Sequence, residues 1–215
     1  MTRWLGWLAA LGLLGGLVMG FAYAPKDAVQ GNVQRIMYVH VPSILTAYAA
    51  FALVLVASLG FLFTRRTGWD RLAHAAGEIG VVFTGLTLVS GSIWGKPTWG
   101  TWWTWDARLT STAILFLIYV GYLMLRRMAE DRERGARYAA VVGIVGALNI
   151  PIVHFSVLWW RTLHQPPTIL GPERAPISPA MALALLVNWA AFILLFAYFL
   201  SKRLALRRLE EEANA

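Results

Sequence analysis

Residues 43–63, SILTAYAAFALVLVASLGFLF, decide the fold, because they form an apolar stretch without a single charged side chain. A helix on the surface of a soluble protein shows a polar face that returns about every 3.6 residues. No such face is present here. About 20 consecutive apolar residues are needed for a helix to cross the hydrocarbon core of a bilayer. This stretch therefore predicts a transmembrane helix.

Five further stretches have the same character. The six predicted spans are residues 4–21, 43–63, 77–94, 110–125, 138–159 and 180–200. Hydrophobic residues make up 58% of the 215-residue chain and charged residues 14%, so no comparable stretch remains for a soluble domain. We predict an all-α integral membrane protein whose residues 1–215 form a single domain of six transmembrane helices.

The first span resembles a secretory signal peptide, because residues 22–24, AYA, have the small-x-small pattern of a cleavage site. Three features argue against its removal. Only Arg3 precedes the apolar run, the run is longer than a usual signal core, and Pro25 would follow the cut. We expect the segment to be retained as the first transmembrane helix.

The basic residues predict the orientation in the membrane. Of the 19 lysines and arginines, thirteen lie at the N-terminus, in the second and fourth loops and in the C-terminal tail. The first, third and fifth loops hold the other six. Because cytoplasmic loops carry the excess of basic residues, both termini are predicted to be cytoplasmic. The same placement explains the net charge of +8 without a nucleic-acid partner.

The third loop, predicted at about residues 94–109, has an unusual composition. Five tryptophans fall within residues 94–105, between glycine, threonine and proline residues. One interpretation is a belt of indoles at the membrane surface. The composition favours another, a flat apolar platform for a large planar ligand, which Gly95 and Gly100 would let the backbone approach closely. Asp106 is expected to cap the helix that follows.

Four histidines are candidates for chemistry. His40 and His164 lie at predicted outer helix ends, at one membrane depth on either side of the tryptophan-rich loop. A single interfacial histidine usually has no special role, but two neutral imidazoles at one depth suit the axial positions of haem iron. His154 lies inside the fifth span and is expected to have a structural or supporting role. His74 is expected to be solvated in a cytoplasmic loop, and Glu78 to cap a helix or join two helices.

Three motifs carry a resemblance to a known family: residues 35–42, RIMYVHVP; residues 99–111, WGTWWTWDARLTS; and residues 149–165, NIPIVHFSVLWWRTLHQ. The motif at residues 99–111 resembles the WWD signature of a superfamily of haem-handling membrane proteins. Within it, the chain resembles the heme exporter protein C (CcmC) branch of the cytochrome c maturation system. The resemblance covers about residues 4–200 and fits the six predicted spans.

The resemblance implies that haem b is a transient, non-covalent cargo at the outer face of a bacterial inner membrane. His40 and His164 would be the axial ligands of its iron. The residues expected to contact haem are Trp99, Gly100, Trp102, Trp103, Trp105, Asp106 and Arg108, with Lys96 and Arg161 as further candidates for the propionates. The chain would present haem to a periplasmic chaperone, CcmE. CcmA and CcmB, an ATP-binding cassette transporter, would act with the small subunit CcmD to release the loaded chaperone.

Two other functions are compatible with a six-helix membrane protein. A b-type cytochrome subunit would hold haem between paired histidines inside facing helices, and here only His154 lies deep in a span. A permease subunit would bind no haem and use the tryptophans as a belt. No cysteine is present, which excludes covalent haem attachment to this chain through thioethers. The sequence shows neither a phosphate-binding loop nor a catalytic triad, so we expect no enzymatic activity.

Overall fold

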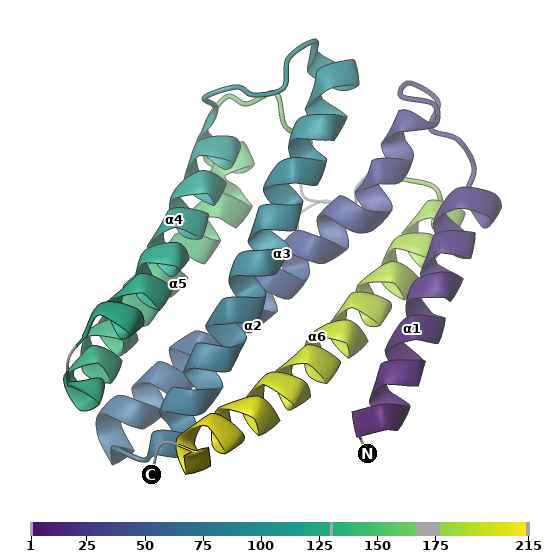
Figure 1. Ribbon diagram of the computed structural model, residues 1–215. Helices are drawn as coiled ribbons and strands as arrows, with labels where there is room; N and C mark the ends of the chain where they lie inside the picture. Colours follow the sequence, from purple (N-terminus) through teal and green to yellow (C-terminus); the bar gives the residue numbers. More distant parts are fainter. Residues whose placement is uncertain (1, 130, 167–176, 214–215) are drawn as a thin grey trace.

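The computed structural model describes residues 2–129, 131–166 and 177–213. Their α-helices are α1 (Thr2–Val18), α2 (Met37–Thr64), α3 (Thr67–Trp99), α4 (Ala107–Met128), α5 (Arg132–Trp159) and α6 (Pro179–Ala213). A π-helical turn at Met19–Tyr23 extends α1, and a 3₁₀ turn at Val33–Ile36 leads into α2. Consecutive helices run in opposite directions, and both termini lie at one end of the bundle (Figure 1). Within the described residues, six helices are long and apolar enough to cross a membrane, which confirms the predicted all-α membrane fold.

The helices are longer than the apolar spans that predicted them. The span at residues 77–94 is part of α3, which begins at Thr67 and ends at Trp99. Gly100 ends this helix, because its backbone takes the left-handed conformation (φ 79°) that glycine adopts without steric cost. Of the predicted loop at about residues 94–109, the part before Gly100 is therefore helical, and Arg108 lies in the first turn of α4.

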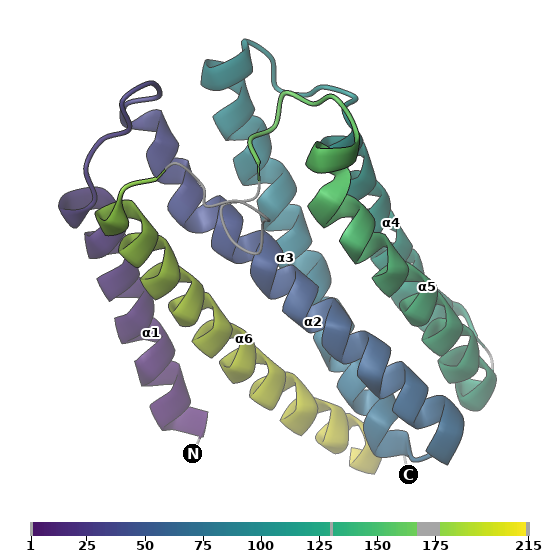
Figure 2. The same cartoon turned by 180° about the vertical axis from the view of Figure 1, so that it is seen from behind.

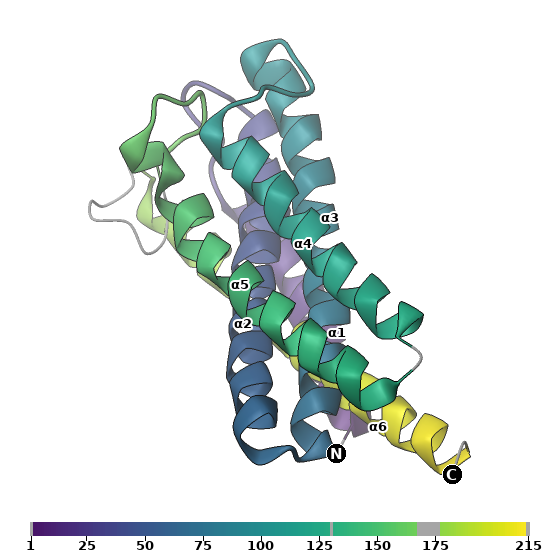
Figure 3. The same ribbon diagram turned by 90° about the vertical axis from the view of Figure 1, so that its left-hand side faces the viewer.

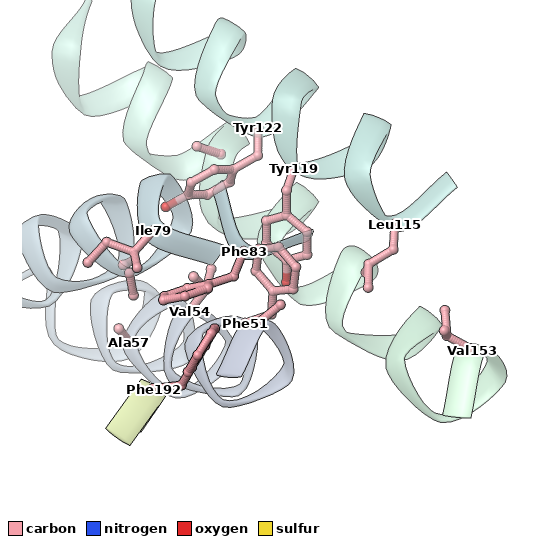
Figure 4. Close-up of a cluster of buried hydrophobic side chains, with 14 residues drawn as sticks. Phe51, Val54, Ala57, Ile79, Phe83, Leu115, Tyr119, Tyr122, Val153 and Phe192 are labelled. Atoms are coloured by element: carbon pink, nitrogen blue, oxygen red, sulfur yellow. The ribbon is translucent and has the colours of Figure 1, made fainter. Parts of the chain in front are cut away.

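Helix α2 is the centre of the bundle, since it packs against α3, α5 and α6 (Figures 2 and 3). Its Phe51 ring stacks on Tyr119 of α4, with the ring centres 3.6 Å apart (Figure 4). Gly80 of α3 makes room for Phe51, because a Cβ atom at this position would collide with the Phe51 ring. A glycine on α3 thus leaves space for large rings from α2 and α4 in the core.

Helix α1 packs along α6 and belongs to the bundle. Asn188 of α6 donates a hydrogen bond to the carbonyl oxygen of Gly16, 2.8 Å away. The opposite face of α1 exposes large apolar side chains, including Trp7, Leu11 and Leu14. Such a face suits contact with lipid rather than water. That the segment is retained, and not cleaved as a signal peptide, stays a prediction.

Candidate functional site

A cavity of about 110 Å³ lies at the end of the bundle opposite the termini. Its wall comes from α2, α3, α4 and α5 and from the segments that follow α3 and α5. Both histidines that were predicted at one membrane depth line it, together with three tryptophans. The fold thus brings together residues from three separate sequence motifs.

The two imidazoles lie close together in the wall of this cavity. His40, near the start of α2, is 8% exposed, whereas His164 lies outside any helix, after α5. Their ring centres are 6.3 Å apart and the ring planes meet at 33°. Metal–imidazole bonds of about 2 Å on opposite sides of one ion place the ring centres roughly 6 Å apart. The spacing therefore matches that of two axial ligands to one metal.

The hydrogen bonds of the rings leave one nitrogen of each available. His40 Nδ1 lies 3.1 Å from the Ser90 hydroxyl, which donates its own proton to the Leu86 carbonyl oxygen and so accepts from the ring. His164 Nδ1 lies 2.9 Å from the Gln165 carbonyl oxygen, which can only accept. These two closer partners favour a proton on Nδ1 and a lone pair on Nε2, whereas the more distant Arg108 Nη1, 3.4 Å from His164 Nδ1, can only donate. A neutral imidazole with a lone pair on Nε2 can bind a metal through that nitrogen.

The surroundings of His164 keep its imidazole neutral. Burial lowers the pKa of His164 to about 4, and the nearby positive charge of Arg108 acts in the same direction. Arg108 Nη1 lies 3.4 Å from His164 Nδ1, and its other terminal nitrogen donates to the His154 carbonyl oxygen. At neutral pH the ring therefore keeps a lone pair for a metal.

Asp106 joins the two outer segments of the site. One carboxylate oxygen accepts from the backbone N–H of Leu109 at 2.9 Å, which confirms the predicted helix cap. The other accepts from the hydroxyl of Thr162 at 2.6 Å. That hydroxyl in turn accepts from the backbone N–H of His164 at 3.0 Å. Asp106 thereby fixes His164 through Thr162.

Helix α3 fits closely around His40. A Cβ atom at Gly91 would lie 2.8 Å from His40 Cε1, so only glycine fits there without displacing the ring. One turn on, Trp94 meets His40 edge-on at 5.7 Å between ring centres. The Trp94 indole N–H donates to the Gln30 side-chain oxygen at 2.8 Å, which ties the first outer loop to α3.

The structure divides the predicted tryptophan platform. Trp94, Trp99 and Trp103 line the cavity, and the Trp99 ring lies 6.0 Å from that of His164. Trp102 and Trp105 are 56% and 82% exposed and do not line it. Trp105 instead packs edge-on against Trp103, with ring centres 5.6 Å apart. Three indoles therefore face the site, and two lie outside it.

The other residues predicted to contact haem also fall into two groups, those that line the cavity and those that do not. Arg108 lines the cavity, whereas Lys96, Gly100 and Arg161 do not. Lys96 donates to the Gly100 carbonyl oxygen at 3.0 Å, across the turn that ends α3. The left-handed turn explains the glycine at position 100 without a ligand. His154 forms part of the deeper wall, with its ring edge-on to Tyr48.

Some residues of the site were not predicted. Ser90, Gly91, Tyr48 and Gln30 shape the cavity or hold its histidine and indole, yet none belongs to the three motifs. Part of this group of residues could have been predicted from the sequence of α3. Small residues recur there every three or four positions, at Thr87, Gly91, Gly95 and Thr98, and so mark one helix face.

At the opposite end, one prediction is wrong and one is confirmed. His74 was expected to be solvated in a loop, but it lies in α3, and its Nε2 accepts from an Arg207 guanidinium nitrogen at 2.8 Å. The helix extends below the apolar span because charged residues at this depth pair with α6. Glu78 joins two helices as expected, since Arg203 and Arg207 of α6 donate to its carboxylate.

The fold and the site together define a multi-pass membrane protein with a pocket of histidines and indoles at one end. The heme exporter protein C family model (CcmC) matches residues 1–215. The chain belongs to this family. Six membrane-spanning helices and the family fit a multi-pass protein of the bacterial inner membrane.

The chain aligns with curated relatives over most of their length. The chain is 46% identical to the heme exporter protein C of Bradyrhizobium diazoefficiens over 198 residues, which are 91% of this chain and 75% of the relative. Identity to the heme exporter protein C of Escherichia coli strain K12 is 41% over 194 residues, 90% of this chain and 78% of that protein. A putative cytochrome c biosynthesis ccmC-like mitochondrial protein of Marchantia polymorpha is 40% identical over 176 residues, which cover 82% and 74% of the two chains.

Proposed function

We propose that this chain binds haem at the cavity between His40 and His164 and delivers it for the maturation of c-type cytochromes. The observation that carries the proposal is the pair of imidazoles, with ring centres 6.3 Å apart, inside an indole-lined pocket. Haem is the cargo and not a resident cofactor, as the name of the family indicates. We take the cargo to be haem b held without a covalent bond, and the chain has no cysteine with which to form a thioether.

The pocket opens to the surface of the protein. Gln165 and Pro166 line it and are exposed, so part of a bound haem can stay accessible there. Trp94, Trp99 and Trp103 offer flat apolar contact to the inner part. Two buried donors, Arg108 Nε and Trp103 Nε1, have no hydrogen-bond partner among the described residues and suit the propionates. An exposed edge remains for a second protein to grasp.

The proposal includes the orientation and the partners. With both termini in the cytoplasm, the pocket faces the periplasm, where the haem chaperone CcmE takes the cargo. CcmA, CcmB and CcmD act after this step, to release the loaded chaperone. The chain itself catalyses no reaction in this scheme, since it holds the iron and presents it. The thirteen-to-six bias of basic residues supports the orientation.

An absorption spectrum of the purified protein tests the proposal. We expect a low-spin, six-coordinate haem spectrum that decreases when purified chaperone is added and the chaperone acquires haem. A protein that stays free of haem after expression with excess haem supply would favour the permease alternative. Reporter fusions after Trp105 and after Arg134 test the orientation. An active periplasmic reporter at Arg134 and a silent one at Trp105 would refute it.

A further inference from the structure

The Nδ1 atom of His164 has two neighbours that make opposite demands on it. The Gln165 carbonyl oxygen, 2.9 Å away, can only accept a hydrogen bond, and Arg108 Nη1, 3.4 Å away, can only donate one. A single ring nitrogen cannot donate to the first and accept from the second at the same time. The two neighbours therefore compete for this atom.

The competition matters for a metal, because a neutral imidazole carries one proton. With the proton on Nδ1, Nε2 has the lone pair that binds iron. With Nδ1 accepting from Arg108, the proton is on Nε2, and the ring cannot bind iron through that nitrogen. Arg108 thus opposes the form of His164 that the proposed function needs. Nδ1 of His40 instead faces the Ser90 hydroxyl, which accepts from the ring because it donates its own proton to a carbonyl oxygen.

Arg108 itself is available for a carboxylate. Its side chain lines the cavity, one terminal nitrogen donates to the His154 carbonyl oxygen, and its buried Nε has no acceptor among the described residues. None of the ion pairs between described residues includes it. Asp106, two positions earlier, uses its carboxylate oxygens for Leu109 and Thr162. Buried charges are usually paired, so a carboxylate on the cargo suits this position.

A carboxylate on the cargo would end the competition for His164. Haem carries two carboxylates, and a guanidinium binds a carboxylate through two parallel N–H···O bonds. Pairing of this kind compensates the charge of Arg108 and directs its N–H groups toward the cargo. Gln165 then keeps the proton on Nδ1 of His164, and Nε2 keeps its lone pair for the iron.

We propose that Arg108 makes ligation of the iron by His164 depend on a free carboxylate of the cargo. This inference rests on the proposed function and adds a specificity to it, a preference for metalloporphyrins with an ionised carboxylate. Without the carboxylate, Arg108 competes for His164, and His40 alone holds the iron. The imidazole stays neutral throughout, and the proton that changes nitrogen exchanges with solvent at the mouth of the cavity, where Gln165 is exposed. Arg108 is a positioning residue in this scheme, since it acts on the iron through His164.

Titration of the purified, haem-free full chain with ferric haem and with its dimethyl ester tests this inference. The two porphyrins have the same iron and the same ring, and only the ester lacks carboxylates. We expect haem to give a low-spin, six-coordinate absorption spectrum and the ester to give a partly high-spin one. The ester should also bind about tenfold more weakly, as for the loss of one hydrogen bond to a charged group.

The variant Arg108→Met removes every donor of the guanidinium and separates this coupling from simple attraction. We expect it to bind both porphyrins with equal affinity and to give both of them low-spin spectra, because nothing then competes for Nδ1 of His164. If Arg108 only attracted a propionate, the variant would bind haem more weakly and leave the ester spectrum unchanged. The matched control Arg161→Met removes an exposed charge at the same end of the bundle, outside the cavity, and should behave like the parent.

Three results would overturn the inference. One is a fully low-spin spectrum of the ester in the parent chain, a comparison that needs no variant and holds even if Arg108→Met does not purify as a helical, monodisperse protein. Another is an ester spectrum that stays partly high-spin in Arg108→Met. The last is the same change of the ester spectrum in Arg161→Met. A parent chain that binds neither porphyrin would contradict the proposed function as well, whereas low-spin complexes of both contradict this inference alone.

Discussion

The two ends of the bundle hold buried polar groups by opposite means. At the histidine end, a hydrogen bond holds Nδ1 of both His40 and His164, and neither Nε2 has a hydrogen-bond partner among the described residues. At the arginine end, charged groups pair directly, as Arg126 does with Asp70. Ligation of iron needs a lone pair, which a protonated or salt-bridged ring does not offer. In the proposed haem site, uncharged partners and Arg108 hold the histidine rings, whereas at the other end ion pairs join the helices.

The largest difference between the two ends is expected when an imidazole is removed from each of them. We expect His40→Ala and His164→Ala to lose the low-spin spectrum and to lower haem retention by well over tenfold, since even the loss of a partner of a ligand costs about that much. Added imidazole should restore part of the spectrum by filling the vacant position. His74→Ala, at the arginine end, should leave the haem spectrum unchanged. Unaltered low-spin spectra in both ligand variants without imidazole would disprove the assignment.

The fit of α3 around His40 gives the next largest effect. We expect Gly91→Ala to displace the His40 ring, because the new methyl group would lie 2.8 Å from Cε1. Overpacking of this kind costs about 1–3 kcal/mol, which corresponds to a loss of haem affinity of about tenfold. Gly85→Ala is the control on the same helix, since its Cβ would make an ordinary contact of 3.5 Å with Phe116. Haem titration should separate the two variants, and equal affinities would show that the ring has room to move.

The tryptophans provide a comparison within the histidine end. Trp99→Ala and Trp103→Ala should each weaken haem binding about fivefold, because an aromatic contact contributes roughly 0.5–1.5 kcal/mol. Trp102→Ala and Trp105→Ala should weaken it less, as neither side chain lines the cavity. Haem retention at equal membrane abundance measures the difference. If all four variants behaved like Trp4→Ala, the indoles would be a general membrane belt.

The smallest effect is expected where a residue acts on a ligand from a distance. Thr162→Val removes the hydroxyl that joins Asp106 to the backbone of His164. We expect a loss of about threefold to fivefold in haem affinity, as for one hydrogen bond of about 1 kcal/mol. Thr104→Val is the control, because the Thr104 hydroxyl is buried without a partner among the described residues. A haem affinity in Thr162→Val equal to that of the control would exclude a positioning role for this hydroxyl.

The six helices were predictable because the bilayer imposes one strong rule on sequence, a long apolar stretch per span. Helix ends were not, since they depend on caps and on partners beyond the hydrocarbon core. At one end, α3 continues beyond the apolar span to Trp99 and stops at the left-handed turn of Gly100. At the other end, His74 pairs with Arg207 in a part of α3 that is not apolar enough to be predicted from hydropathy. The wrong expectation for His74 has the same cause.

In the site, too, some features were predictable from the sequence and others were not. His40 and His164 were recognisable as a pair from residue type and depth, and the structure places them in the wall of one cavity. Which indoles face that cavity depends on how the last turns of α3 are rotated, and this rotation places Trp94 and Trp99 inside. The hydrogen bond from Thr162 to Asp106 joins two segments that lie far apart in the chain. Such contacts follow from packing and cannot be read from a single stretch of sequence.

The two proposed ligands of the iron differ in how firmly the chain holds them, and this difference has a kinetic consequence. His40 is anchored in α2 and enclosed by α3, so its ring can leave the iron only if two packed helices separate. His164 lies outside the helices and is held by a few hydrogen bonds. We expect the bond to His164 to break first and the bond to His40 last. If the proposed function holds, we expect release to pass through an intermediate in which His40 alone holds the iron.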